Sequence, residues 1–168
     1  NSLKKLEYRG YDSAGLATLS DNLIDEKKCS GRVEELEKIL FKNPSNGNIG
    51  IGHVRWATHG IPNIINAHPH SSEKVSVVHN GIIENSDELK KDLEEKGFKF
   101  KSQTDTEVIT ILVTRFLENS KPLESVFKTL KKLKGSFALG IIFKNFPDII
   151  IGARRGSPLA VGYSNEEN

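Results

Sequence analysis

The sequence predicts an α+β fold in which sheets pack beneath helices. Segments with strand-like patterns lie near both ends of the chain, whereas helical patterns gather in the middle. A doubly wound parallel sheet would instead show strands and helices in regular alternation. At 168 residues the chain has the length of one domain with a sizeable core. We therefore expect a single α+β domain.

The N-terminal third is expected to begin with a helix and a hairpin. Apolar residues at helical spacing precede Gly10, where a helix would end. The segment Ser20-Asp21-Asn22 separates two short strand-like runs, as in a hairpin. The elements predicted here are a helix ending near Gly10, strands at 15–19 and 22–28, a helix at 32–41 and a buried strand at 48–56.

The next segment, residues 57–73, has no apolar period and is rich in glycine, proline and histidine. Such a long irregular stretch in a compact domain is more often functional than filler. Beyond it, Asn80-Gly81 lies between the apolar runs 75–79 and 82–83, which is the strongest short signal for a hairpin. We therefore expect a type I′ turn at Asn80-Gly81.

Two capping boxes mark helix starts in the second half of the chain. Asn85 is followed three residues later by Glu88, and Thr104 by Glu107, each ahead of an apolar stripe. Pro122 opens a third helix. The elements predicted here are helices at 85–97, 104–116 and 122–133, followed by strands at 137–143, 148–153 and 158–162.

Composition argues against several classes of partner. The formal net charge is only +2, and lysines alternate with acidic residues over 90–96, as on a solvated helix face. We therefore expect neither nucleic acid nor an anionic membrane as partner. No apolar run approaches the roughly 18 residues of a transmembrane helix. The single cysteine, Cys29, excludes an internal disulfide and fits a reducing, cytoplasmic setting.

The ends of the sequence suggest a part of a larger chain. The sequence contains no methionine and opens within a helical pattern, so we expect a segment to precede it. Residues 164–168 are typical of the beginning of an acidic linker. We expect the domain to span residues 1–163.

All five histidines fall within residues 53–79: His53, His59, His68, His70 and His79. One hypothesis is a metal site, because His68 and His70 at i, i+2 share one face of an extended segment. The other is that the histidines tie down an irregular loop by hydrogen bonds. We favour the second, because no cysteine lies nearby and Glu73 is the only acidic residue of the stretch.

Four other features carry both a structural and a functional interpretation. Asn80-Gly81 can form a turn and also present N–H groups to an oxyanion. Asp105 can simply complement a helix dipole. Arg55, at a strand end, suits a carboxylate, a phosphate or a structural ion pair. Cys29 has no base or oxyanion partner nearby in the sequence, so we interpret it as an ordinary surface or edge cysteine and not as a nucleophile.

Taken together, five motifs resemble one family, the glutamine–fructose-6-phosphate aminotransferases (isomerising), also called glucosamine-6-phosphate synthases. The resemblance covers almost the whole chain and keeps the order and spacing of the motifs. They are residues 6–15 (LEYRGYDSAG), 52–60 (GHVRWATHG), 66–70 (NAHPH), 79–85 (HNGIIEN) and 104–108 (TDTEV).

The resemblance implies an N-terminal-nucleophile hydrolase fold, a four-layer α-β-β-α sandwich of two antiparallel sheets. It implies a glutaminase that hydrolyses L-glutamine through a thioester on an N-terminal cysteine, without a cofactor or metal. Ammonia then passes to an isomerase part of the same polypeptide, which converts fructose 6-phosphate to glucosamine 6-phosphate and forms a dimer or larger assembly. Because the sequence lacks the cysteine, we expect these 168 residues alone to be inactive.

The resemblance also implies a role for individual residues. Arg55 matches the residue that pairs with the α-carboxylate of glutamine, and Asp105 the one that holds its α-ammonium group. The remaining matches are Thr58 and His59 in the same pocket, Asn80 and Gly81 in the oxyanion hole, Arg9 beside the cysteine, Trp56 at the ammonia channel and His68 in a pocket-side loop.

Three other functions compete with this one. The chain could belong to another class II amidotransferase with a different ammonia acceptor. It could be a glutamine-binding module without catalysis. It could be a metal-binding domain built on the histidines.

Overall fold

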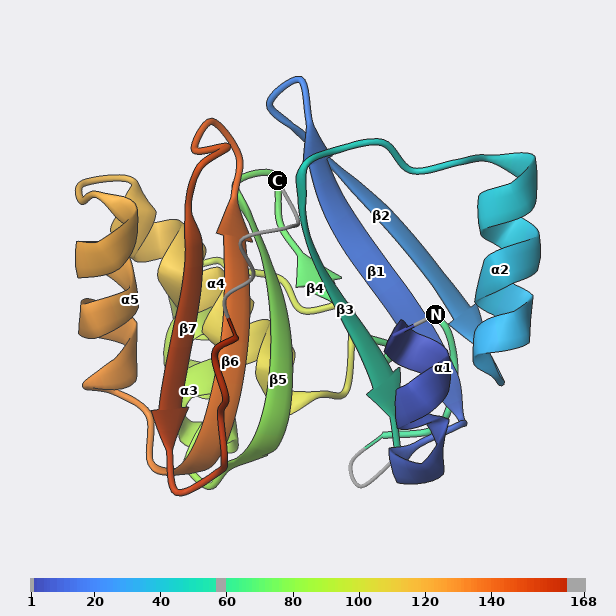
Figure 1. Ribbon diagram of the computed structural model, residues 1–168. Coiled ribbons are helices and arrows are strands. Elements are labelled where there is room, and N and C mark those ends of the chain that lie inside the picture. Colours follow the sequence, from blue (N-terminus) through green and yellow to red (C-terminus); the bar gives the residue numbers. More distant parts are fainter. Residues whose placement is uncertain (1, 57–59, 163–168) are drawn as a thin grey trace.

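Four layers make up the molecule, in the order helices, sheet, sheet, helices (Figure 1). The computed structural model describes residues 2–56 and 60–162. One sheet has the strand order β2-β1-β3 and the other the order β4-β5-β6-β7, with every neighbouring pair antiparallel. The predicted α+β class and the four-layer sandwich are therefore confirmed.

The first sheet carries the predicted hairpin. Asp21 and Asn22 connect its strands and have φ angles of 51° and 59°. Both angles are positive, as a type I′ turn requires. The outer face of this sheet packs against the amphipathic helix at 33–42, and Leu3 of the N-terminal helix joins the same apolar cluster. The elements of this half are α1 (Ser2–Leu6), the 3-10 helix η1 (Glu7–Arg9), β1 (Ser13–Ser20), β2 (Leu23–Ser30), α2 (Val33–Lys42) and β3 (Ile49–Arg55).

The second sheet packs its outer face against the predicted group of three helices (Figure 1). The largest apolar core of the described residues lies here, with Phe137, Ile141 and Phe143 from the sheet and Ile109 and Leu112 from the helices. The elements are β4 (His70–Ser71), β5 (Val75–Ile83), α3 (Ser86–Glu95), α4 (Asp105–Leu117), α5 (Pro122–Leu130), β6 (Gly135–Phe143) and β7 (Ile150–Arg155). None of the helices in the described ranges combines the length and apolar character that crossing a bilayer requires.

The space between the sheets is apolar at the start of β3 and polar at its end. Ile49 and Ile51 join a small apolar cluster between the sheets. Alternate residues of a strand share a face, so His53 and Arg55 continue the same face toward the end of β3. The apolar end holds the sheets together, and the polar end opens into a cleft.

The turn predicted at Asn80-Gly81 is wrong. Both residues lie inside β5, where Asn80 is opposite Ala138 and Gly81 is opposite Phe137. Gly81 has a φ of 145°, and a Cβ there would lie 2.2 Å from the carbonyl oxygen of Ser136. The glycine therefore permits a close approach between β5 and β6. Pairing with β6, more than fifty residues later in the chain, joins the two apolar runs into one strand.

Neither predicted capping box forms, although both helices begin close to the expected residue. Glu107 accepts hydrogen bonds from the backbone N–H groups of Lys101 and Ser102 instead. The carboxamide of Asn85 bonds the carbonyl oxygen of Lys132 and the N–H of Lys134. These two side chains therefore stabilise the loops before and beside the helices instead of capping them.

The strand predicted at 158–162 is also wrong. Leu159 and Val161 are 42% and 71% exposed. A strand needs a neighbouring ladder to satisfy its backbone groups, and none of the described strands pairs with this segment.

Candidate active site

A cleft of about 510 Å³ opens at the polar end of the space between the sheets. Its walls come from β3, β5 and the start of α4, with η1 at its mouth. Most of the residues selected from the sequence meet here, although they lie up to about a hundred positions apart. The cleft is lined by Arg9, Arg55, Trp56, His68, Asn80, Gly81 and Asp105, together with His53, His79, Thr104 and Thr106.

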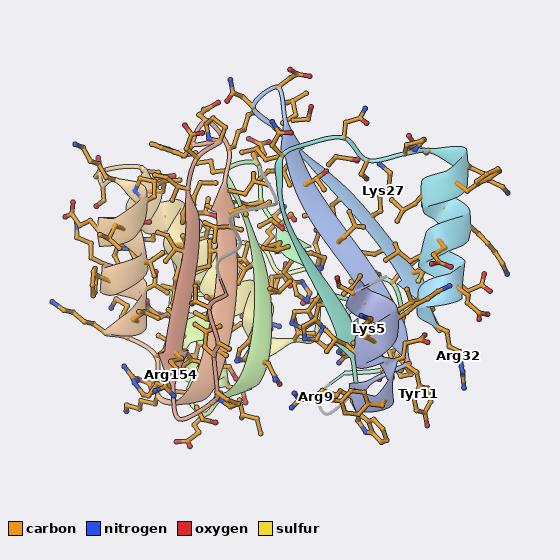
Figure 2. All side chains as sticks on the ribbon, in the orientation of Figure 1. Lys5, Arg9, Tyr11, Lys27, Arg32 and Arg154 are labelled. Carbon is orange, nitrogen blue, oxygen red and sulfur yellow. The ribbon has the colours of Figure 1, made fainter. Side chains whose placement is uncertain are left out.

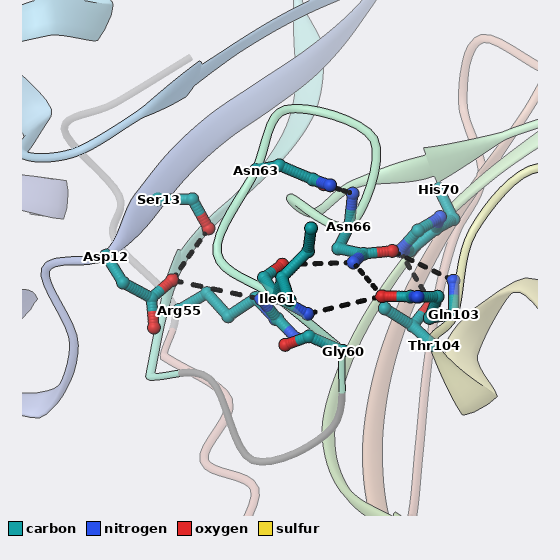
Figure 3. Close-up of polar contacts among 10 residues, drawn as sticks. All are labelled: Asp12, Ser13, Arg55, Gly60, Ile61, Asn63, Asn66, His70, Gln103 and Thr104. Carbon is teal, nitrogen blue, oxygen red and sulfur yellow. Dashed lines mark hydrogen bonds and ion pairs between the residues drawn. The ribbon is translucent and has the colours of Figure 1, made fainter.

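Arg55 supplies a buried positive charge at the end of β3. Its side chain is 6% exposed, and Nη1 lies 3.9 Å from the Asp12 carboxylate (Figure 3). Nη2 is 3.5 Å from the carbonyl oxygen of Gly60. A guanidinium cannot lose its proton in a protein, and its planar fork matches a carboxylate. Its position in the cleft therefore suits a carboxylate ligand.

Asp105 supplies a negative charge from the first turn of α4. Its Oδ2 accepts a hydrogen bond of 2.8 Å from the N–H of Ile83, and Oδ1 lies 3.7 Å from Nδ1 of His79. The helix N-terminus stabilises the carboxylate form. Because Arg55 belongs to one sheet and Asp105 to a helix packed on the other, the cleft presents opposite charges from its two sides.

Three histidines, His53, His68 and His79, line the inner wall of the cleft, and His70 lies behind His68. The ring centroids of His53 and His68 are 4.4 Å apart, and those of His68 and His70 are 5.0 Å apart. Burial lowers the pKa of His53 to about 4 and that of His70 to about 3. Burial also holds the pKa of His68 well below its usual value, helped by the neighbouring histidines and Arg55. The rings of His53, His68 and His70 are therefore neutral at pH 7.

Two of these histidines tie the irregular loop to α4, as the favoured hypothesis predicts. His68 contacts the hydroxyl of Thr106 at 2.8 Å, and His70 contacts that of Thr104 at 2.9 Å. In the described part of the chain, no group of three or more His, Cys, Asp or Glu side chains is arranged to hold a metal ion. His59 lies outside the described residues, as does Thr58.

Asn66 and Gln103 form a second set of hydrogen bonds that holds the loop, and the sequence did not predict it (Figure 3). The Asn66 Nδ2 donates to the carbonyl oxygen of Ile61 and to Oε1 of Gln103, at 3.0 and 3.1 Å. The N–H of Gln103 donates to Oδ1 of Asn66 at 2.9 Å. These bonds fix the loop that leads to His68. The two residues are 37 positions apart, so no local pattern could have paired them.

The mouth of the cleft is aromatic and basic. Trp56 is 60% exposed, and its ring lies edge-on to that of Tyr11 at 5.5 Å. Figure 2 shows Arg9 and Tyr11 together at the end of the molecule below α1. Arg9 is exposed, so its charge faces a solvated entrance.

Cys29 lies outside the cleft. It occupies the edge strand β2 and packs with Ala14, Val33 and Leu36 beneath α2. It is 4% exposed, so it is an edge cysteine as expected but not a surface one. Burial raises the pKa of its thiol, which favours the unreactive form. This position agrees with the interpretation that Cys29 is not a nucleophile.

Comparison with known proteins now identifies the class. The family model described as "Glutamine amidotransferase domain" matches residues 62–167, and the chain belongs to this family. A solved structure of glutamine phosphoribosylpyrophosphate amidotransferase from B. subtilis is 28% identical, with a TM-score of 0.74. The match covers 84% of this chain and 31% of that one, and the shared fold is the N-terminal-nucleophile hydrolase sandwich.

Several curated relatives carry a more specific name than the family model does. The chain is 53% identical to the glutamine–fructose-6-phosphate aminotransferase [isomerizing] of Zymomonas mobilis, over 99% of its length. It is 55% identical to the protein of the same name from Clostridium acetobutylicum. The chain spans 28% of the length of each of these relatives. It therefore corresponds to the glutamine-hydrolysing domain of this kind of enzyme.

Proposed function

We propose that this chain is the glutaminase half of an enzyme that makes D-glucosamine 6-phosphate and L-glutamate from D-fructose 6-phosphate and L-glutamine. The observation that carries the proposal is the presence of Arg55 and Asp105, with opposite charges, in the walls of one cleft. The relatives that match nearly the whole chain have names that agree with it.

The cleft would hold glutamine by its two charged ends. The Arg55 guanidinium would bind the α-carboxylate in a bidentate pair. The Asp105 carboxylate would bind the α-ammonium group. We assign Thr58 and His59 to the same pocket on the resemblance of their motif. A zwitterionic amino acid satisfies both charges at once, whereas a simple dicarboxylate or amine satisfies one.

The chemistry would take place beside Asn80 and Gly81. We assign the nucleophile to an N-terminal cysteine outside these 168 residues, because Cys29 is buried away from the cleft. Its α-amino group, with a reference pKa of roughly 7.7–8.0, would serve as the base. The thiolate attacks the amide carbon, the C–N bond breaks and ammonia leaves. Water then hydrolyses the thioester to glutamate. N–H donors of Asn80 and Gly81 would stabilise the oxyanion in both steps.

The remaining assignments concern the surroundings of the reaction. Arg9 would steady the cysteine end, Trp56 would control passage of ammonia, and His68 would support the pocket from its loop. The ammonia acceptor would be bound by an isomerase domain of the same polypeptide, which would also form the dimer. We assign the glutaminase domain to residues 1–163, a linker to 164–168, and the protein to the cytoplasm.

The test is a glutaminase assay on the intact protein, with ammonia, glutamate and glucosamine 6-phosphate measured separately. We expect Arg55→Ala and Asp105→Ala to raise KM for glutamine strongly. Asp92→Ala, on the outer surface of α3, is the control for loss of a carboxylate. Binding of glutamine without release of ammonia would favour the non-catalytic module. Release of ammonia without any glucosamine 6-phosphate would favour another class II amidotransferase.

A further inference from the structure

One buried hydroxyl joins two of the cleft histidines. Thr106, the second residue of α4, is fully buried. Its Oγ1 lies 2.8 Å from Nε2 of His68 and 3.0 Å from Nδ1 of His79. His68 belongs to the loop before β4, and His79 belongs to β5. The hydroxyl therefore connects a loop, a strand and the first turn of a helix.

Thr106 is the only hydrogen-bond partner that the described residues offer to either ring. The second nitrogens, Nδ1 of His68 and Nε2 of His79, are buried without a hydrogen-bond partner in the described ranges. A ring held through one nitrogen can turn when that bond is lost. Among the described residues, Thr106 therefore makes the one hydrogen bond that orients the His79 ring.

The hydroxyl also sets where the protons lie. A hydroxyl has one proton, so it can donate to one imidazole while it accepts from the other. Nδ1 of His79 is 3.7 Å from Oδ1 of Asp105, and a nearby carboxylate favours a proton on that nitrogen. In the arrangement that follows, His79 Nδ1–H donates to Thr106, and the Thr106 hydroxyl donates to His68 Nε2.

We propose that Thr106 is a positioning residue, which holds His79 so that the Asp105 carboxylate keeps its orientation toward the ligand. This inference rests on the proposed function, in which Asp105 binds an α-ammonium group. Asp105 is held on one side by the N–H of Ile83 and lies beside His79 on the other. Without the Thr106 hydroxyl, the Nδ1–H of His79 turns to the carboxylate and competes with the ligand.

The experiment compares two ligands that differ only in the α-ammonium group, L-glutamate and glutarate. Their dissociation constants are measured by calorimetry on the intact wild-type protein and on Thr106→Val, which has the same shape but no hydroxyl. We expect Thr106→Val to weaken L-glutamate binding about tenfold, the equivalent of one hydrogen bond. Glutarate, which lacks the ammonium group, should be unaffected. Thr106→Ser should restore wild-type binding of L-glutamate.

Thr110→Val is the matched control, one turn further along α4. Its hydroxyl bonds the carbonyl oxygens of His70 and Thr106, so the same chemical change removes no bond to the His68 or His79 ring. Equal weakening of both ligands by Thr106→Val would overturn the inference, since that is the effect of a general structural role. An equal loss in Thr110→Val, or no rescue by serine, would overturn it too.

The proposed function is checked separately in the same experiment. Wild type should prefer L-glutamate to glutarate, and Asp105→Asn should lose that preference. If wild type shows no preference, or Asp105→Asn keeps it, then the ammonium site assigned to Asp105 is wrong and the inference falls with it. If these two results are as expected and only the Thr106 result fails, the inference alone is overturned.

Discussion

Replacement of Gly81 by alanine tests the close approach between β5 and β6. The added Cβ would lie 2.2 Å from the Ser136 carbonyl oxygen and 2.8 Å from the Phe137 Cα. Both are backbone atoms, so no side chain can rotate to make room. The φ of 145° is also a conformation that alanine rarely adopts. The strand pair must therefore separate at the edge of the cleft.

The expected loss of stability combines the cost of the strained φ with the cost of the disturbed strand pairing. A strained φ costs about 1–3 kcal/mol, and disrupted ladder hydrogen bonds add about 0.5–1.5 kcal/mol each. We expect a loss of about 3–4 kcal/mol in the free energy of unfolding, which corresponds to roughly 10 °C in Tm for a chain of this size. Thermal unfolding followed by circular dichroism measures the shift.

Substitutions at two other glycines distinguish the cost of the strained φ from the cost of the backbone contact. Gly97 has a φ of 87° with no atom within 4 Å of an added Cβ, so Gly97→Ala reports strain alone. Gly162 has neither a positive φ nor a neighbour, so Gly162→Ala should change Tm little. If Gly81→Ala lowers Tm no more than Gly97→Ala does, the contact with Ser136 carries no cost and the reasoning is refuted.

Three further predictions concern the site and its histidines. The free energy of unfolding should fall as pH drops from about 6.5 toward 4. His53 and His70 have folded pKa values of about 4 and 3, so the unfolded chain takes up protons first. Denaturant midpoints that stay constant over this range would contradict this prediction. Arg55→Lys should raise KM for glutamine about tenfold with little change in Tm, because lysine keeps the charge but loses the bidentate fork; an unchanged KM would argue against a carboxylate at Arg55. Cys29 should react with a thiol reagent only after denaturation, since it is 4% exposed and its pKa is raised; rapid reaction of the folded protein would show that α2 does not cover it.

Local patterns predicted the elements whose signals are local. The Asp21-Asn22 hairpin and the amphipathic helix α2 are examples, because turn chemistry and apolar spacing act within a few residues. The Asn80-Gly81 turn failed because pairing with β6 overrode the local preference. The capping box at Glu107 was predicted wrongly because its carboxylate accepts hydrogen bonds from nearby loop N–H groups.

The candidate site also contains residues that the sequence predicted and one that it did not. Arg55, Asn80, Gly81 and Asp105 were selected because their motifs resemble those of a family, and the cleft brings them together. The Thr106 hydroxyl was missed, because its importance comes from two histidines 38 and 27 positions away in the sequence. No spacing rule connects such residues before the chain is folded.

In the proposed function, in which Arg55 and Asp105 bind one ligand, the affinity for that ligand depends on the spacing of the two sheets. Arg55 is the last residue of β3 in the first sheet, and Asp105 is the first residue of α4, which packs on the second sheet. At the apolar end, Ala17 and Ile142 are fully buried in the cluster between the sheets and do not line the cleft. A larger side chain at Ala17 would separate the sheets and pull the two ligand-binding charges apart. A larger residue at position 17 should therefore weaken ligand binding as well as folding, although Ala17 does not line the cleft.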